Sequence, residues 1–142
     1  FKPNVVLLAD YGFNAYSTLI ETRIDIVDKK PDLVQRFVDA SMIGWYNYLY
    51  GDNAQANTMI KRDNPEMTDG QIAYSLGKIK ERGIVDSGDA LTYGVGVITD
   101  ARMKSFFDKM AKAGVVPANI DYTRGYTLRF IGKKVGMELR PQ

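Results

Sequence analysis

Apolar positions recur at three- and four-residue steps over residues 30–51, which form the longest helical pattern in the chain. Pro31 suits the first turn of a helix, Asp32 places a carboxylate near the positive end of the helix dipole, and Gly51 marks the end. The repeating face comprises Leu33, Val34, Phe37, Val38, Ser41, Trp45, Tyr48 and Leu49. Gly44 in mid-helix costs up to about 1 kcal/mol relative to Ala, so we expect another element to approach closely there.

Two apolar runs precede this helix, and both predict short strands. Val5–Leu8 is a continuous apolar run bounded by turn-forming residues, whereas Tyr16–Thr22 alternates between apolar and polar positions. Thr22 and Asp25 then have the spacing of a capping box, which predicts a short helix through Val27.

Three further helices are expected downstream, each marked by boundary residues. They extend from the cap pair Asp52 and Gln55 to Lys61, from the capping box of Thr68 and Gln71 to Gly83, and from Thr99 to Gly114. Residues 84–98 predict an irregular extended segment, and residues 121–131 predict a short aromatic-bearing turn of helix. The sequence therefore predicts one mainly α-helical domain over residues 1–142, with one or two short N-terminal strands and a loosely held tail over residues 132–142.

Composition narrows the chemistry that this chain can perform. It contains no cysteine and no histidine, which argues against a zinc finger, a thiol enzyme and a Ser-His-Asp hydrolase. The 19 basic and 17 acidic residues are interleaved without a basic stripe, so no nucleic-acid partner is expected. No stretch approaches the roughly 20 apolar residues that span a bilayer. Phe1 is not an initiator Met, so we expect further sequence upstream.

Two motifs favour structure over chemistry. Gly94–Thr99, reading GVGVIT, lacks the third glycine and the lysine of phosphate-binding loops, so glycines that ease a tight backbone passage explain it better. The stripe of Met and Phe residues in the last long helix is typical of core; it comprises Met103, Phe106, Phe107 and Met110. No two carboxylates have the spacing of an acid and base pair, so we expect no enzyme activity, no metal and no cofactor.

The loop Ala9–Tyr16 carries the candidate ligand-binding residues Asp10, Tyr11, Gly12 and Asn14. It follows a predicted buried strand, where open α/β sheets expose their binding crevice. Tyr11 would stack on a planar ligand, Asp10 would accept from a cationic or N–H group, and Asn14 would offer both a donor and an acceptor. An alternative of equal weight is that Gly12 and Asn14 only turn the chain while Asp10 caps a backbone amide.

An ordered series of motifs between Val5 and Phe130 resembles a known family. It comprises ADYGFNAYSTLIET, KKPDLVQRFVDASMIGWYNYLYGD, DNPEMTDGQI, GIVDSGDA, GVGVITDARMKSFFDKMAKAGV and DYTRGYTLRF. The series is similar to the type II substrate-binding proteins of ABC importers, in the branch that handles nitrate, sulfonates, taurine and thiamine-precursor pyrimidines.

The resemblance implies an intact protein with a two-lobed α/β fold in the periplasm. Such a protein closes on a small organic or anionic solute in an interlobe cleft and delivers it to an ABC permease without covalent chemistry. This chain resembles only the C-terminal portion, and of the family's ligand contacts only the Asp10–Asn14 loop carries over. Helices shaped to cover a missing sheet leave apolar surface exposed, so we expect a homo-oligomer formed through that surface or through strand exchange.

Two other interpretations stay open. The chain could be a stand-alone helical interaction or oligomerisation module without solute binding. A pyrimidine-precursor enzyme is less favoured, because that chemistry in relatives depends on histidine and cysteine residues that this chain lacks. The sequence upstream of Phe1 separates the first two, since a signal peptide followed by a further lobe belongs with transport.

Overall fold

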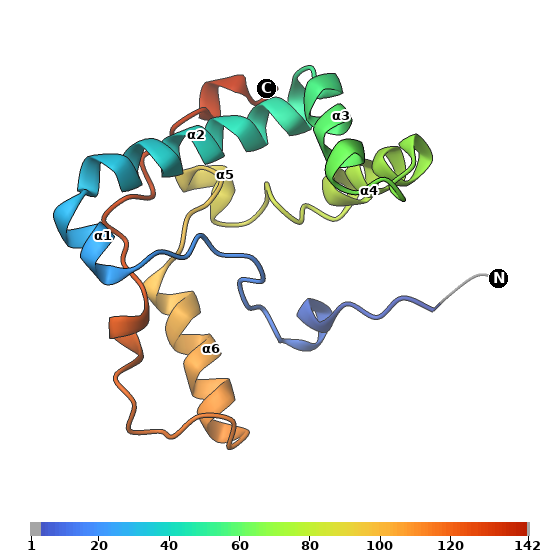
Figure 1. Cartoon of the computed structure of the whole chain (residues 1–142). Coiled ribbons are helices and arrows are strands. Elements are labelled where there is room, and N and C mark those ends of the chain that lie inside the picture. The colour runs from blue at the N-terminus through green and yellow to red at the C-terminus, as the bar shows by residue number, and fades with distance from the viewer. Residues whose placement is uncertain (1–3, 142) are drawn as a thin grey trace. The chain divides into compact units, whose positions relative to one another are not determined.

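The computed structural model describes residues 4–141, which are mainly helical (Figure 1). The α-helices are α1 (Ile24–Lys29), α2 (Pro31–Tyr50), α3 (Ala54–Asp63), α4 (Asp69–Glu81), α5 (Ala90–Tyr93) and α6 (Asp100–Lys112). Short 3-10 turns are η1 (Leu8–Tyr11), η2 (Tyr122–Gly125) and η3 (Met137–Leu139). The long helix predicted after Lys30 is therefore present as α2.

The predicted strands at Val5–Leu8 and Tyr16–Thr22 are wrong, because no strand forms within residues 4–141. A strand requires a neighbouring strand to pair its N–H and C=O groups, and the described residues supply no such ladder. Val5 and Val6 are 68% and 63% exposed, so the first apolar run is not buried either. The α/β class that the resemblance implies is thus absent from the described part of this chain.

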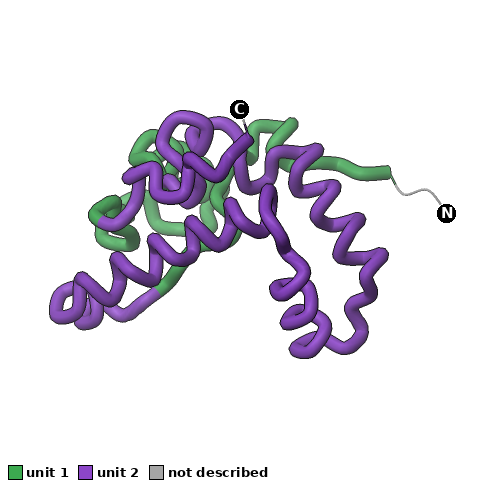
Figure 2. Tube along the Cα trace, turned by 90° about the horizontal axis from the view of Figure 1, so that it is seen from above, with its two compact units in different colours: residues 1–21, 98–129 green, residues 22–97, 130–142 purple. Residues whose placement is uncertain are grey.

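The chain divides into two compact units (Figure 2). Unit 2 comprises residues 22–97 and 130–142, and it contains all the buried apolar residues among the described residues. They are Val38, Tyr46, Leu49, Ile72, Ala90, Val95 and Phe130. Both α1 and η3 pack against α2 in this unit, so α2 is the element on which its core is built.

The buried face of α2 is centred on Tyr46, whose ring is completely inaccessible to solvent. Its hydroxyl accepts a hydrogen bond from the backbone N–H of Val95 at 3.1 Å, which satisfies the polar end of a buried ring. Leu33 and Phe37, both predicted on the core face, are instead 47% and 61% exposed. The periodicity predicted the helix correctly. It did not show which apolar side chains of the helix would be buried, because Leu33 and Phe37 fit the helical repeat as well as Val38 does.

Cap chemistry was predictable only where side chain and backbone exchange hydrogen bonds locally. The capping box of α4 is confirmed, because Thr68 Oγ1 accepts from the Gln71 N–H at 3.2 Å and Gln71 Oε1 accepts from the Thr68 N–H at 2.8 Å. Thr99 likewise caps α6 by accepting from the Arg102 N–H at 3.3 Å. The capping box predicted at Thr22 is wrong, since α1 begins without a side-chain cap. Before α3, the predicted cap residue Asp52 accepts through Oδ1 from the Ala54 N–H at 2.9 Å, although the N-cap residue Asn53 itself makes no side-chain cap.

The segment predicted as irregular and extended contains the short helix α5, and its glycines make close backbone contacts. Gly94 and Gly96 have φ values of 92° and 83°, which favour glycine. A Cβ atom on Gly96 would lie 2.1 Å from Met42 Sδ, and one on Gly94 would lie 3.1 Å from Lys134 Cα. These distances support the structural interpretation of GVGVIT.

The described residues of the segment 132–142, for which the sequence predicts a loosely held tail, contact α2 and its neighbours. Lys133 Nζ donates to Gln35 Oε1. A Cβ atom on Gly136 would lie 3.0 Å from the Tyr46 ring, so the backbone passes close to the core there. Arg140 forms an ion pair with Asp86 at 3.1 Å.

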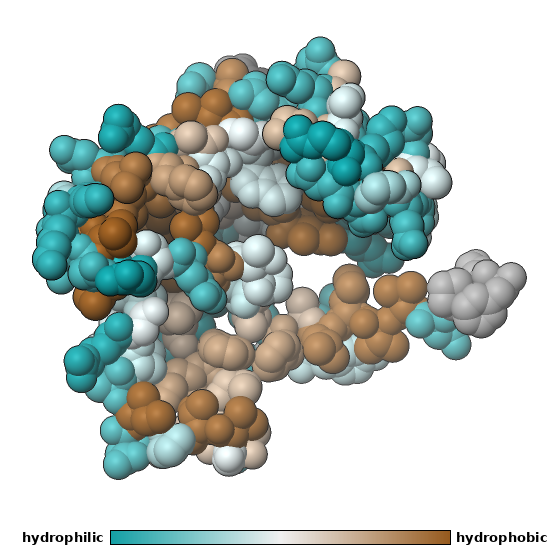
Figure 3. Space-filling view, viewed as in Figure 1, coloured by the Kyte–Doolittle hydropathy of each residue, from teal (hydrophilic) through white to brown (hydrophobic). Residues whose placement is uncertain are grey.

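Unit 1 comprises residues 1–21 and 98–129. It is organised around α6 and has no buried apolar residue among its described residues. Apolar side chains are exposed along the N-terminal segment (Figure 3). Leu8 is 63% exposed, like Val5 and Val6. Unit 1 therefore depends on surface contacts of α6 rather than on a closed core.

Candidate functional site

The candidate loop begins with the 3-10 turn η1 and reverses direction at Gly12. The Gly12 N–H donates to the Ala9 carbonyl at 3.1 Å, and the next N–H, of Phe13, donates to the Leu8 carbonyl at 3.0 Å. Gly12 has a φ of 84°, in the left-handed region where a Cβ atom is disfavoured. The glycine therefore sets the path of the loop, as its turn chemistry predicted.

Two basic side chains of α6 attach this loop to the helix. Arg102 donates from Nε to the Asn14 carbonyl and from a terminal nitrogen to the Ala15 carbonyl, both at 3.2 Å. Lys109, about two helical turns further along α6, donates from Nζ to the Gly12 carbonyl. The carbonyls of Gly12, Asn14 and Ala15 thus each accept a charge-assisted hydrogen bond from α6, which satisfies loop carbonyls that have no place in a strand.

Aromatic rings complete the attachment. Phe13 packs edge-on against Phe106 of α6, with ring centroids 6.0 Å apart and planes at 72°, a favourable aromatic geometry. The Arg102 guanidinium lies 4.1 Å from the centroid of the Tyr16 ring, which adds a cation–π contact. The Tyr16 hydroxyl accepts from the Thr99 N–H at 3.0 Å, so it also ties the loop to the start of α6.

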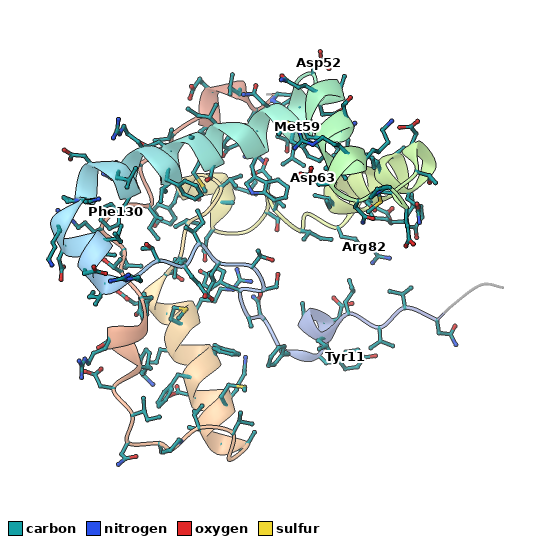
Figure 4. The ribbon with its side chains drawn as sticks, in the orientation of Figure 1. Tyr11, Asp52, Met59, Asp63, Arg82 and Phe130 are labelled. Atoms are coloured by element: carbon teal, nitrogen blue, oxygen red, sulfur yellow. The ribbon has the colours of Figure 1, made fainter. Side chains whose placement is uncertain are left out.

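The predicted contact residues Asp10 and Tyr11 face outward from this attached loop. The Tyr11 side chain is 78% exposed at the end of η1 (Figure 4). Asp10 is exposed as well, and its carboxylate caps no backbone amide among the described residues. Asn14 takes part in the attachment through its carbonyl and keeps its side chain exposed. The structure thus leaves one carboxylate, one ring and one amide free on a fixed backbone.

Sequence reasoning missed the residues that hold the loop. Arg102, Phe106 and Lys109 occupy positions i, i+4 and i+7 of α6, so they share one side of the helix. This spacing of two cations around an aromatic ring could have indicated a surface that binds backbone carbonyls. It was missed because Phe106 was assigned, with the other Phe and Met residues of the helix, to the core.

Residues 121–129 also contact α6, through side chains other than those that hold the loop. The rings of Phe107 and Tyr122 stack with centroids 4.5 Å apart and planes at 19°. The Tyr126 hydroxyl donates to Asp100 Oδ1, and this hydrogen bond raises the pKa of Tyr126 to about 12. Tyr122 and Tyr126, which belong to the aromatic-bearing turn predicted over residues 121–131, therefore both contact α6.

The loop presents groups that can bind a ligand. Among residues 4–141, no group of three or more Asp or Glu side chains could hold a metal ion. No helix in the same residues is long and apolar enough to cross a membrane. An exposed ring next to a carboxylate can recognise a planar group and a donor, which is the chemistry expected for the loop from its sequence.

Comparison with known proteins bears on the first part of the chain. Residues 2–56 match the family described as NMT1/THI5 like, and this range includes the loop Ala9–Tyr16 and all of α2. No curated protein and no solved structure matches the chain. The family resemblance found in the sequence is confirmed over residues 2–56, where the chain fits a fragment of the nitrate, sulfonate, taurine and thiamine-precursor family of substrate-binding proteins.

Proposed function

We propose that this protein is an extracytoplasmic solute-binding component of an ABC importer. It binds a small organic or anionic solute and passes it to a permease, and no covalent chemistry is part of its role. The match of residues 2–56 to a substrate-binding family is the observation that carries this proposal. The complete absence of histidine and cysteine from the sequence also favours binding over catalysis.

The loop Ala9–Tyr16 is the part of this chain that we propose contacts the solute. It lies within the matched range, and Arg102 and Lys109 fix its backbone. A fixed backbone lowers the ordering cost of binding. Tyr11 then offers an exposed ring at little further entropic cost, because only two side-chain torsions have to be fixed.

A ligand panel tests the proposal on the 142-residue chain. Taurine, other sulfonates, nitrate, pyrimidines and flavins are screened by thermal unfolding, and we expect one class to raise Tm. A ligand at 100 times its Kd stabilises the native state by about 2.7 kcal/mol, which is roughly 10 °C for a chain of this size. Failure of every class to raise Tm would contradict solute binding by this chain.

Variants of the loop identify the binding residues. Tyr11→Ala removes a stacking contact of about 0.5–1.5 kcal/mol, so Kd should rise roughly two- to tenfold. Asp10→Ala should also weaken binding. Tyr74→Ala and Asp28→Ala serve as matched controls, since they change an exposed tyrosine and an exposed aspartate in unit 2. Unchanged affinity in both loop variants would remove this loop from the binding site.

A further inference from the structure

The side of α2 that faces away from the core of unit 2 carries a row of exposed residues. Leu33 and Phe37 are 47% and 61% exposed. Apart from the local helix backbone, no atom lies within 4 Å of the position that a Cβ atom on Gly44 would take. We define the outer face of α2 by its exposed residues at alternating steps of four and three, which are Leu33, Phe37, Ala40, Gly44 and Asn47.

The spacing of the outer face is the one at which two helices pack side by side. Residues at alternating steps of four and three form a row nearly parallel to the helix axis, so a second helix can contact all of them at once. The first half of the row contains the large side chains of Leu33 and Phe37, and the second half contains the small residues Ala40 and Gly44. One half of the outer face therefore protrudes and the other half is recessed.

An antiparallel copy of the same helix matches these two halves. When Phe37 of one copy lies opposite Ala40 of the other, the same register places Leu33 opposite Gly44. Two-fold symmetry repeats both pairs, so each layer combines a large side chain with a small residue and the contact is filled without voids. A parallel copy would instead place Phe37 against Phe37 and Gly44 against Gly44.

The charges at the two ends of α2 also favour the antiparallel direction. The first end, residues 28–36, contains three basic and two acidic residues and has a net charge of +1. The last end, residues 45–55, contains Asp52 as its one charged residue and has a net charge of −1. The C-terminal carbonyl groups of the helix add partial negative charge there. Unlike ends meet in an antiparallel pair and like ends meet in a parallel pair, so the charge distribution complements a second copy in the antiparallel direction.

We propose that α2 pairs with α2 of a second copy of this chain through its outer face, in an antiparallel, two-fold arrangement. The helix has 20 residues and is about 30 Å long. A contact one helix wide belongs to the small class of interfaces, below about 1,200 Å² in total, so the dimer is weak and depends on concentration. The proposal uses unit 2 alone, and it stands whether or not the loop Ala9–Tyr16 binds a solute.

Two matched glycine variants test the proposal on the 142-residue chain. Gly44 in α2 and Gly77 in α4 are both exposed, and an added Cβ atom meets no atom within 4 Å at either, apart from the local helix backbone. Lysine is a better helix former than glycine, so neither Gly44→Lys nor Gly77→Lys should unfold the chain. The two variants add the same charge, but only the first adds it to the outer face.

Sedimentation equilibrium measures the dimer Kd of both variants and of the wild type. Gly44→Lys should raise Kd at least about tenfold, because an ammonium group in the middle of the contact loses its hydration without gaining a partner. Gly77→Lys should leave Kd within about twofold of the wild-type value. A wild type that stays monomeric up to about 500 µM, an unchanged Kd in Gly44→Lys, or an equal rise in both variants would overturn the proposal.

Cross-linking distinguishes the antiparallel pair from any other association. The sequence contains no cysteine, so a single introduced cysteine can be linked only to its counterpart in another copy. Ala40→Cys lies near the proposed two-fold axis and should be joined to its counterpart by bismaleimidoethane. Asn47→Cys lies on the same face, but its counterpart is about 25 Å away along the helices, so it should stay unlinked.

Both contrary cross-linking results count against the proposal. Efficient linking at both positions would show that the helices run parallel. Failure of Ala40→Cys to link, at a concentration where the wild type is dimeric, would show that the copies meet through another surface.

Discussion

At the residue scale, the pair of Tyr126 and Asp100 makes a contact whose strength depends on pH. The hydrogen bond raises the pKa of Tyr126 from its ordinary value of 10.0 to about 12, because a carboxylate accepts from the neutral phenol and repels the phenolate. The folded state therefore binds this proton more tightly than the unfolded state does. Its stabilising effect is complete below pH 10 and is lost as the pH rises from 10 towards 12.

Spectrophotometric titration of the tyrosines measures this effect. The wild-type curve should contain a phenolate component with a pKa of about 12 that is absent from Tyr126→Phe. In Asp100→Asn the same component should move down towards 10.0, since the carboxylate that causes the shift is gone. A Tyr126→Phe curve that keeps the component would assign it to another tyrosine.

Single residues were predictable where their role is local. Gly12 and the caps at Thr68 and Thr99 act within a few residues of sequence, so turn and cap chemistry identified them. Arg102 acts on carbonyls 87 and 88 positions away. No spacing rule reaches that far, and the key attachment of the candidate site was missed for this reason.

At the element scale, part of the predicted core face of α2 stays exposed. Leu33 and Phe37 are exposed, and no atom within 4 Å would meet a Cβ atom placed on Gly44. The close approach expected at Gly44 is therefore absent. Helical periodicity predicted the element itself, whereas the choice between its two apolar stripes depends on which neighbours the fold supplies.

Alanine at Gly44 should stabilise this chain. With space for the methyl group and a helical backbone, Gly44→Ala should raise the free energy of unfolding by up to about 1 kcal/mol, measured by urea denaturation at low protein concentration with an unchanged m-value. Gly96→Ala is the matched contrast, because its φ of 83° and its 2.1 Å approach to Met42 Sδ should make the same substitution destabilising. A lower midpoint for Gly44→Ala would show that another element packs at that turn.

The predicted strands failed at the same scale for a related reason. Val5–Leu8 and Tyr16–Thr22 have strand-like patterns, but a pattern describes only one side of a ladder. No strand forms in the described residues to pair with either run, and only the carbonyls of the loop between the two runs are bound, by Arg102 and Lys109. The local pattern was therefore consistent with strands, but the described residues contain no partner strand.

At the scale of the whole molecule, exposed apolar side chains favour association between copies. Val5, Val6 and Leu8 are each more than 60% exposed. Burying one such side chain contributes about 1.5–3 kcal/mol, and two copies contribute twice this set. Association costs on the order of 4–15 kcal/mol, which is comparable to this gain, so burial of the run in a second copy is able to drive association.

Sedimentation velocity tests this association directly. The weight-average sedimentation coefficient of the wild type should rise with concentration up to about 100 µM, because the exposed N-terminal run is buried in a second copy, either as an apolar surface or as an exchanged strand. Val6→Lys should lower this rise, since a lysine cannot be buried unpaired at low cost. Tyr74→Lys, at a position on α4 that is 68% exposed, should leave the rise unchanged. A wild type that stays monomeric throughout would contradict association through the N-terminal run, and an equal loss in both variants would show that added charge alone, rather than the apolar run, controls the effect.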